Sequence, residues 1–442
     1  MAMEAAVVWN QVMALLLNLK IWFMRQVLRL PPTPLFRPGK AGLGPSVKAE
    51  TQKELAARAQ ATADAGDACV CVEIVGPGGV DQLQGRVGCW AVCGYNLMKE
   101  FGGSQRISAP LAAALLPPDM VVVGNKAFSV NYADICVRWG LYESALRYVG
   151  WPIVPGFDIA GEVEAAGAES GFSKGDRVFG CTLFGGYASR VVVPRRQLLR
   201  LPEGLSFETA AALPTIAATA LHAVQLAGAW PSSLHLGSSR DALVHSAAGG
   251  VGDMLCQVLR LCGMRVVGVV GSKAKISSCK ADVVIDKSSE DWAQSARRHA
   301  PRGFRAVFDA NGVATLKQSY GLLGRNGRLI VYGFHSNLPK CDGGLGMLSP
   351  LSWLQMSLDL MRTPHFDPMF LTLDSKAVLG FNLSFFAEEH ELLAQYFAQI
   401  GEWIASGKIK APPVRTFFLD GVREAHNALT SGNSVGKMVV TF

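Results

Sequence analysis

The stretch ALVHSAAGGVGDMLCQVLRLCGMRVVGVVGSKAK, residues 242–275, decides the fold of this chain. It opens with Ala242–His245, an apolar run that predicts a buried strand. A turn of small residues follows, and then Met254–Leu261, which has apolar residues at helical spacing. Val266–Val270 predicts a second strand, rich in β-branched residues. Strand, small-residue turn, helix and strand form a βαβ unit, which is the unit that binds a dinucleotide.

The turn matches the dinucleotide pattern G-x-G-x-x-G with one change. The three pattern positions are Ala247, Gly249 and Gly252, so alanine replaces the first glycine, and Gly250 and Val251 lie between the other two. A turn without bulky side chains lets backbone N–H groups and the N-terminus of the helix approach a pyrophosphate. The alternative is that this is only a tight strand–helix connection.

The end of the second strand predicts which dinucleotide is bound. A site that prefers NAD places Asp or Glu on the ribose hydroxyls about twenty residues after the last glycine. Here Ser272, Lys273 and Lys275 occupy that region, and no acidic residue is present. A hydroxyl and two cations suit a 2′-phosphate, so we predict NADPH; the alternative is that both lysines are solvated loop residues.

The rest of the chain divides into a second parallel-sheet part and a β-rich part. Three further buried strands are expected at 281–285, 306–308 and 328–331, with helices between them. Residues 151–210 have short strands and frequent turns, the pattern of a small barrel. Shorter elements are predicted as strands at 70–75, 121–123, 128–130 and 437–442 and as helices at 207–221 and 392–405.

Charge and composition exclude some classes of protein. The net charge of +7 is uneven, because residues 1–48 hold six basic residues and one acidic residue, a balance of +5. The folded body is therefore close to neutral and has no basic–aromatic motif, so we expect no nucleic-acid partner. The ten cysteines are scattered without paired C-x-x-C motifs, which indicates free thiols, a reducing compartment and no structural zinc.

The N-terminal extension raises the question of a membrane. Residues 5–24 are mostly apolar but are interrupted by Asn10, Gln11, Asn18 and Lys20. They fit a membrane-spanning segment, an interfacial helix, an organellar presequence or a helix packed on the protein itself. We expect a cytoplasmic protein, with attachment to a membrane surface through residues 5–30 and mitochondrial or plastid import as alternatives.

Several motifs carry a resemblance to a known family; in order, they are NYADICVRWGLYES (131–144), PGFDIAGEV (155–163), GDRV (175–178), HSAAGGVG (245–252), GRLIVYGF (327–334) and SVGKMVV (434–440). Together they resemble the medium-chain dehydrogenase/reductase superfamily and its zinc-free quinone oxidoreductase branch. WLQMSLDLM (353–361), GFNL (380–383) and GKIKAPP (407–413) are similar to the synaptic-vesicle membrane protein-like group of that branch.

The resemblance implies an α/β fold with two domains. A GroES-like β-barrel catalytic domain would be formed by residues 68–213 and 380–442, and a Rossmann domain with a doubly wound parallel sheet by 214–379, preceded by an extension over 1–67. It also implies a cleft between the domains, use of NADPH, a small electrophilic substrate such as a quinone or enone, and a homodimer.

Zinc is disfavoured by one position. Where zinc-dependent relatives have a G-H-E run, this chain has Gly156, Phe157 and Asp158. Phenylalanine cannot coordinate a metal, and Cys181 is not followed by a lobe of four cysteines. We therefore predict no metal site; a zinc alcohol dehydrogenase is the disfavoured alternative.

The resemblance also assigns residues to the cleft. Asn131 and Tyr132 would form its floor, where Asn131 bonds the nicotinamide ribose or a substrate oxygen, and Tyr132 and Tyr142 are the candidate proton donors. Both tyrosines also fit ordinary core packing. Many relatives have Phe at the position of Tyr132, so its hydroxyl is not essential to the family's chemistry.

Further residues are expected to contact the cofactor. By resemblance Thr219 contacts the nicotinamide, although it also fits an ordinary helical threonine bonded to a carbonyl one turn back. The other expected contacts lie at strand ends or at the C-terminal strand: Asn311, Gly333, Phe334, Phe381 and Lys437. Phe381 is expected in an apolar pocket with Phe184 and Trp353, and Lys437 also fits a surface lysine.

Two functions follow from these residues. The first is a zinc-independent oxidoreductase that transfers a hydride from NADPH to a quinone or another activated carbonyl or alkene. The second is a membrane-associated protein that binds NADPH with weak or no catalysis, a hypothesis motivated by the apolar extension.

Overall fold

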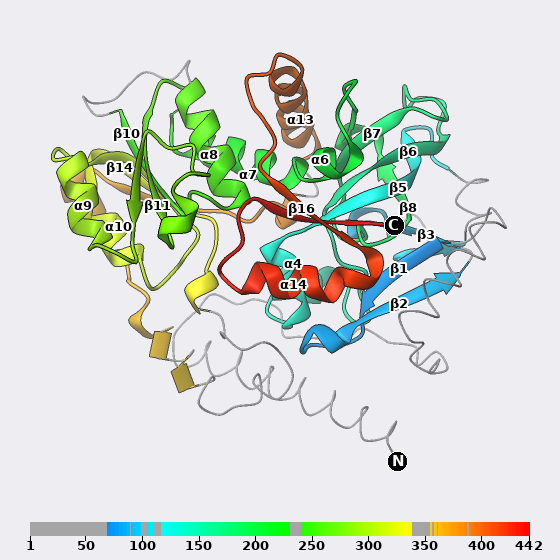
Figure 1. Ribbon diagram of the computed structural model, residues 1–442, viewed down its shortest axis with the longest axis horizontal. Coiled ribbons are helices and arrows are strands. Elements are labelled where there is room, and N and C mark those ends of the chain that lie inside the picture. Colours follow the sequence, from blue (N-terminus) through cyan, green and yellow to red (C-terminus); the bar gives the residue numbers. More distant parts are fainter. Residues whose placement is uncertain are drawn as a thin grey trace.

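The computed structural model describes residues 69–88, 90–98, 104–108, 116–229, 240–337, 354–355, 358–359, 361–386 and 389–442. The predicted extension over 1–67 and Trp353 lie outside these residues. Two sheet domains stand side by side, with the parallel sheet at one end and the barrel at the other (Figure 1).

The barrel domain is built on one large, mostly antiparallel sheet. Its strand order is β4-β3-β8-β5-β6-β7-β9, with β17 and then β16 attached to β5. The strands are β3 (Trp90–Cys93), β4 (Arg106–Ser108), β5 (Met120–Val130), β6 (Asp158–Ala166), β7 (Arg177–Cys181), β8 (Arg190–Pro194), β9 (Leu198–Arg200), β16 (Val414–Phe418) and β17 (Lys437–Thr441). A separate hairpin pairs β1 (Cys69–Ile74) with β2 (Leu83–Gly88).

The prediction of two short strands at 121–123 and 128–130 was wrong. They form the single strand β5, whose pairing with β6 shifts register at two places. Polar residues lie between the two apolar runs, but Asn125 is buried and its amide donates to Gly186 O and Ala188 O, both at 3.0 Å. The polar side chain is satisfied inside the barrel, so the strand continues through it.

The second sheet has six parallel strands in the order β12-β11-β10-β13-β14-β15. They are β10 (Asp241–His245), β11 (Arg265–Val270), β12 (Val283–Asp286), β13 (Phe304–Asp309), β14 (Leu323–Val331) and β15 (Ala377–Gly380). The chain runs outward from β10 to β12 and then returns to the other side of β10. This reversal lies between β10 and β13, and ligands of such sheets bind outside the carboxyl ends of the strands at that point.

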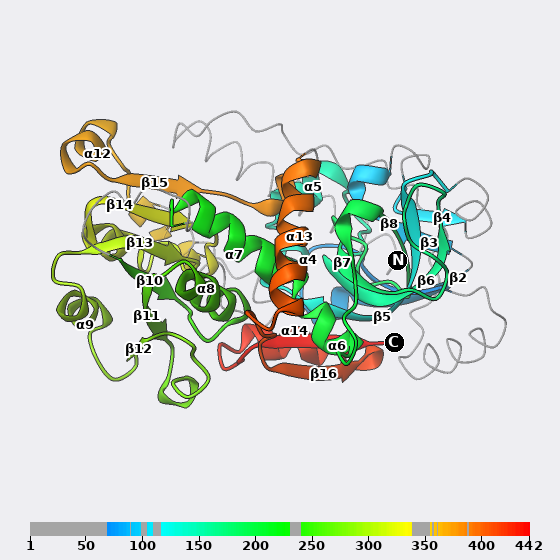
Figure 2. The same cartoon turned by 90° about the horizontal axis from the view of Figure 1, so that it is seen from above.

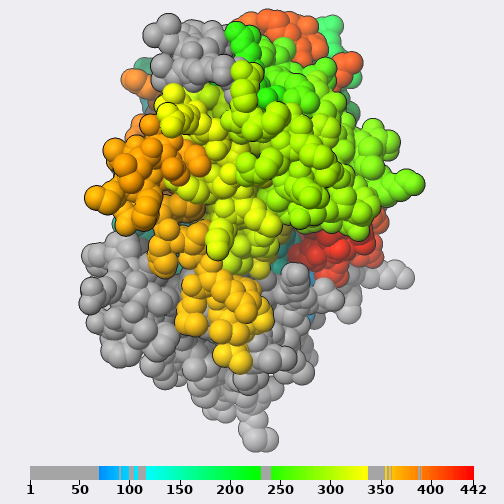
Figure 3. Space-filling view, turned by 90° about the vertical axis from the view of Figure 1, so that its left-hand side faces the viewer, coloured from blue at the N-terminus to red at the C-terminus, as the bar shows by residue number. Residues whose placement is uncertain are grey.

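The helices pack around and between the two sheets (Figure 2). They are α4 (Tyr132–Arg138), α5 (Glu143–Tyr148), α6 (Phe207–Ala211), α7 (Pro214–Leu226), α8 (Gly250–Leu261), α9 (Trp292–His299), α10 (Leu316–Gly321), α12 (Pro368–Asp374), α13 (His390–Ala405) and α14 (Val422–Thr430). Figure 3 looks onto the end of the molecule formed by the parallel-sheet domain.

The apolar stretch predicted as one helix over 207–221 is two helices. Pro214 is the first residue of α7, where its missing N–H costs nothing, and the chain bends between Ala211 and Pro214. Phe207–Leu226 is long and apolar enough to span a membrane by composition, but 72% of its most apolar window is buried. It packs against α8 and α13 as a core element.

The C-terminal strand joins the two domains. β17 pairs with β5 in the barrel, while Gly436, just before it, forms a bridge with Gly249 of the small-residue turn. Gly436 has φ +66°, and a Cβ there would lie 1.9 Å from Pro413 O, so only glycine fits. The turn that opens α8 therefore touches the barrel through the last residues of the chain.

Candidate active site

The turn between β10 and α8 is closed by backbone contacts. Gly249 N donates to Ser246 O at 2.9 Å, and Ser246 itself has φ +53°. A Cβ on Gly252 would lie 2.3 Å from Ser246 O and 2.7 Å from Ala247 Cα, both backbone atoms that cannot yield. Helix α8 begins at Gly250, earlier than predicted, so its N-terminus opens directly from the turn. This is the side-chain-poor helix N-terminus that a pyrophosphate requires.

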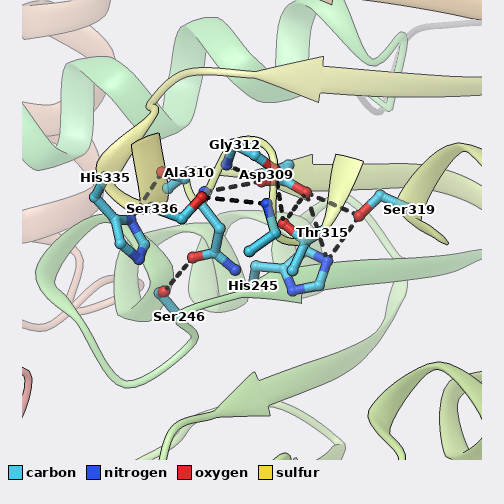
Figure 4. Close-up of polar contacts among 11 residues, drawn as sticks. His245, Ser246, Asp309, Ala310, Gly312, Thr315, Ser319, His335 and Ser336 are labelled. Carbon is cyan, nitrogen blue, oxygen red and sulfur yellow. Dashed lines mark hydrogen bonds and ion pairs between the residues drawn. The ribbon is translucent and has the colours of Figure 1, made fainter. Parts of the chain in front are cut away.

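A second polar loop supports this turn from β13. Asn311 is 3% exposed, and its Oδ1 accepts a hydrogen bond from Ser246 Oγ at 3.1 Å. Asn311 is itself held by Asp309, whose Oδ1 accepts from Asn311 N at 2.8 Å and from Gly312 N at 3.1 Å (Figure 4). Asn311, predicted to contact the cofactor, thus lies beside the small-residue turn and fixes its first residue.

The other carboxylate oxygen of Asp309, Oδ2, accepts hydrogen bonds from buried hydroxyl groups. Asp309 Oδ2 accepts from Thr315 Oγ1 at 2.7 Å and from Ser319 Oγ at 2.8 Å. Because Ser319 gives its proton to Asp309, His245 Nε2, 2.9 Å from Ser319 Oγ, must be the donor in that pair. Burial lowers the pKa of His245, and Asp309 raises it to a smaller extent. His245 is therefore a structural residue.

Lysines gather at the ends of β11 and β12. Lys273 is exposed and begins a short 3-10 helix (Lys273–Lys275), and Ser272 precedes it. Lys275 Nζ donates to Gly432 O at 2.6 Å; burial lowers its pKa, and so does the charge of Lys287. Lys287 is exposed and directly follows β12. The edge of the sheet beside the turn therefore carries three lysines, and one of them, Lys275, already donates a hydrogen bond to a backbone carbonyl.

On the barrel side, the polar centre is Asp158, the first residue of β6. Its carboxylate is fully buried. Oδ1 accepts from Thr215 N, in the first turn of α7, at 2.7 Å. Oδ2 accepts from Ser129 Oγ and, at 2.8 Å, from Asn131 Nδ2. Asp158 thus binds donors from the end of β5, the start of α4 and the start of α7.

Lys437 completes this cluster. Its side chain is 5% exposed, and Nζ donates to Asn131 Oδ1 at 2.6 Å and to Val130 O at 3.4 Å, and lies 3.6 Å from Asp158 Oδ2. Its stem covers Gly250, where a Cβ would lie 2.9 Å from Lys437 Cδ. Burial lowers the pKa of Lys437, and the carboxylates of Asp158 and Asp134 raise it. Lys437 is therefore a buried lysine and not a surface one.

A second buried carboxylate lies on α4. Asp134 accepts from Asn131 N at 2.8 Å, from Gly156 N at 3.0 Å and from Tyr187 OH at 3.2 Å. Burial raises the pKa of Asp134 to about 7. Tyr187 OH also lies 3.0 Å from His426 Nε2, and burial holds the pKa of His426 well below its ordinary value.

The two candidate proton donors have different surroundings. The ring of Tyr132 packs edge-on against His335, 5.8 Å between centroids, so it faces the loop after β14 of the other domain. Tyr142 OH donates to Asn382 Oδ1 at 2.9 Å, and its ring packs edge-on against Phe157 and Phe184. Burial raises the pKa of both hydroxyls, so both stay protonated at neutral pH.

The other residues predicted to contact the cofactor have the following surroundings. Thr219 Oγ1 donates to Thr215 O at 2.7 Å, the helical bond expected as its alternative. A Cβ on Gly333 would lie 2.8 Å from Ala310 O, so the loops after β13 and β14 touch, and Phe334 beside it is 55% exposed. Phe381 packs edge-on against His222, with ring centroids 4.6 Å apart. The assignment of these residues to cofactor contacts stays a prediction.

Sequence reasoning missed three groups. Asp158 was considered only as a neighbour of a zinc ligand, and its partners Ser129 and Thr215 carry no motif. Asp309 was assigned no role, although it lies two residues before Asn311. Lys287 was missed although it lies two residues after the strand predicted at 281–285, and the carboxyl ends of parallel strands share one edge.

Two family models match the chain. The alcohol dehydrogenase GroES-like domain matches residues 117–203, inside the barrel, and the zinc-binding dehydrogenase model matches 279–440. The chain belongs to the medium-chain dehydrogenase/reductase superfamily. The predicted fold class, a GroES-like barrel with a Rossmann sheet, is confirmed.

Individual relatives agree with the superfamily assignment. The synaptic vesicle membrane protein VAT-1 homolog of Danio rerio is 30% identical over 325 residues, which cover 73% of this chain and 64% of that protein, slightly under two thirds of its length. The human quinone oxidoreductase is 26% identical over 350 residues, covering 77% of this chain and 95% of that protein.

A solved structure of a mycobacterial protein complexed with NADPH superposes with a TM-score of 0.64. It is 25% identical, and the match covers 85% of this chain and all of that one.

Proposed function

We propose that this protein is an NADPH-dependent oxidoreductase of the superfamily that reduces a quinone or another activated carbonyl or alkene without zinc. The observation that carries the proposal is the juxtaposition of the small-residue turn with the Asn131–Lys437 pair. Lys437 covers Gly250 of the turn and bonds Asn131 of the barrel. The proposed cofactor side and the proposed substrate side therefore meet at Lys437.

The residues of the turn fit a dinucleotide. Gly252 stands where any side chain would strike backbone, and the N-terminus of α8 opens beside it. Exposed Lys273 and Lys287 supply cations for a 2′-phosphate at the ends of β11 and β12. A relative of similar fold was solved with NADPH, which supports the same choice here.

In the proposed reaction the cofactor carries the reducing power, and the protein contributes binding, orientation and hydrogen bonds. NADPH would supply the hydride. The residues of the chain would orient the nicotinamide and the electrophile, and a hydrogen-bond donor in the cleft would stabilise the developing oxyanion. Tyr132 and Tyr142 keep their protons at neutral pH because burial raises the pKa of each. The Tyr142 hydroxyl would have to give up its hydrogen bond to Asn382 Oδ1 before it could donate to a substrate.

The side chain at position 157 supports a reaction without zinc. Phe157 is buried among aromatic rings and offers no metal-binding atom. Among the residues that the structure describes, no three His, Cys, Asp or Glu side chains are grouped to hold a metal ion. Stoichiometric zinc in elemental analysis of the purified protein would overturn this part of the proposal.

Steady-state oxidation of NADPH with a panel of quinones and enones tests the activity. We expect turnover with at least one member and a higher Kd for NADH than for NADPH. Binding of NADPH without turnover of any electrophile would favour the second function, a membrane-associated nucleotide-binding protein. Carbonate-resistant membrane association that is lost on deletion of residues 1–48 would support that attachment.

The homodimer, the cytoplasmic location and the membrane contact through residues 5–30 stay predictions. Size-exclusion chromatography with light scattering tests the first. Fractionation of cells that express the full-length chain tests the other two.

A further inference from the structure

We propose that Asp158 and Lys437 are positioning residues for hydride transfer, which fix the amide of Asn131, the first turn of α7 and the turn before α8 in one arrangement. This inference rests on the proposed function and gives Asp158 and Lys437 a role that acts through other groups rather than by contact with the cofactor. Neither side chain is required to touch the substrate. Each acts through groups that line the cleft.

The first step is the orientation of Asn131. Its Oδ1 faces the ammonium of Lys437 at 2.6 Å, and its Nδ2 faces the carboxylate of Asp158 at 2.8 Å. The flipped amide would turn oxygen toward the carboxylate and NH₂ toward the ammonium. Both contacts would be repulsive in a region shielded from water, so the two charges select one orientation.

The second step connects Asp158 to the helix that carries Thr219. Asp158 Oδ1 accepts from Thr215 N at 2.7 Å, in the first turn of α7, where an anion also faces the positive end of the helix. Thr219 lies one turn further along and donates to Thr215 O at 2.7 Å. A shift of Asp158 would therefore move the start of the helix that is predicted to contact the nicotinamide.

The third step connects Lys437 to the small-residue turn. Its stem fills the space that a side chain at Gly250 would occupy. The residue before it, Gly436, donates its N–H to Ala248 O at 3.3 Å. The polar atoms that surround the ammonium, Val130 O, Asn131 Oδ1 and Asp158 Oδ2, all belong to the barrel. Lys437 therefore connects the turn to the barrel, and its hydrogen bond to Oδ1 fixes the side chain of Asn131.

The pair is tested with Asp158→Asn, Lys437→Met and the double variant. Glu73→Gln is the matched control, because Glu73 is a buried carboxylate of β1 that pairs with Arg86 and Arg106 and, within the described part of the chain, forms no hydrogen bond or ion pair with Asn131, Asp158 or Lys437. For each single variant we expect kcat to fall about 10- to 100-fold with the Kd for NADPH changed less than about threefold. The deuterium isotope effect from [4-²H]NADPH should rise, since misplaced reactants make the chemical step limiting.

The pH profile separates positioning from mere stability. The carboxylates that face Lys437 are Asp158 and Asp134, and both raise its pKa against the effect of burial. In Asp158→Asn that pKa should fall, so activity should decline at a lower alkaline pH than in the wild type. Lys437→Met should lack this alkaline limb, and Glu73→Gln should keep the wild-type profile.

Variants that are destabilised like Glu73→Gln but keep the wild-type kcat, isotope effect and pH profile would overturn the inference. If the wild type binds NADPH but reduces no electrophile, the proposed function is wrong, but the positioning role of Asp158 and Lys437 can still be tested. The fluorescence lifetime of bound NADPH then decides this inference, which requires a shorter lifetime in Asp158→Asn at unchanged Kd. An unchanged lifetime, or a wild type that does not bind NADPH, overturns it.

Discussion

Asp158 in the barrel and Asp309 in the parallel sheet are both fully buried carboxylates, and both accept hydrogen bonds at each oxygen. They differ in where their donors come from. The donors to Asp309 lie two to ten residues further along the chain, and all are neutral. Those to Asp158 lie 27 to 57 residues away, and Lys437 adds a charge from the far end of the sequence.

The difference shows how one chemical group serves two purposes. The Asp309 network folds a single loop and sets its backbone beside the dinucleotide turn. The Asp158 network ties together elements that only the tertiary fold brings close. We therefore expect substitution of Asp309 mainly to lower the free energy of unfolding. Substitution of residues in the Asp158 network should mainly lower kcat.

The largest effect is expected for Asp309→Ala. It leaves two backbone N–H groups and two hydroxyls without an acceptor in a buried region, which should lower the free energy of unfolding by about 3–5 kcal/mol. Urea unfolding measures it. Asp176→Ala is the control, because that carboxylate accepts from Ser173 N and pairs with Arg200 at the surface, where water replaces both contacts, so its loss should cost about 1 kcal/mol. Equal losses would contradict the comparison.

Next in size are the lysines at the edge of the parallel sheet. Lys273→Ala and Lys287→Ala should each raise the Kd for NADPH about five- to thirtyfold, roughly 1–2 kcal/mol, because each removes one phosphate ion pair in a partly exposed site. The Kd for NADH should change little. Lys317→Ala, an exposed lysine on α10, is the control. Equal effects on both cofactors would remove the 2′-phosphate assignment.

Two buried histidines and one buried carboxylate should have opposite effects on the pH dependence of stability. Burial lowers the pKa of His245, so the unfolded chain binds its proton first, and stability falls as pH drops below about 6.5, by up to about 1.4 kcal/mol per unit. His426 acts in the same direction. The pKa of Asp134, raised to about 7, acts oppositely, because the folded state takes that proton first and gains stability as pH falls through 7.

The opposite contributions can therefore be separated by two single substitutions. His245→Asn should flatten the loss of stability between pH 6.5 and 5.5, measured as the free energy of unfolding at each pH. Asp134→Asn should steepen it. A slope unchanged by either substitution would show that these groups do not control the acid limb.

The smallest effect is expected for Tyr142→Phe. Its hydroxyl donates to Asn382 Oδ1, which also accepts from Ser384 N at 3.0 Å, so the loss is one neutral hydrogen bond of about 0.5–1.5 kcal/mol. We expect kcat to fall less than tenfold in steady-state assays. A fall of a hundredfold or more is the size expected for a general acid and would identify Tyr142 as the proton donor.

Local patterns predicted the parallel sheet well and the cleft only in part. The spacing of apolar residues and glycines identified β10, the turn, α8 and β11, because each signal lies within a few residues of the next. The break at Pro214 and the single long strand β5 were missed, since the first was hidden in an alanine-rich run and the second depends on a buried amide. No pattern in the neighbouring sequence predicted that Lys437 would be buried.

The sequence by itself determined the turn between β10 and α8, the absence of a ligating side chain at Phe157 and the cations after β11. These properties depend on residue type and short spacing. Only the tertiary structure decided that Asp158, Asn131 and Lys437 form one buried cluster. Its members come from distant strands and helices, and an ion pair is stable inside a protein only when folding brings both charges and their hydrogen-bond partners together.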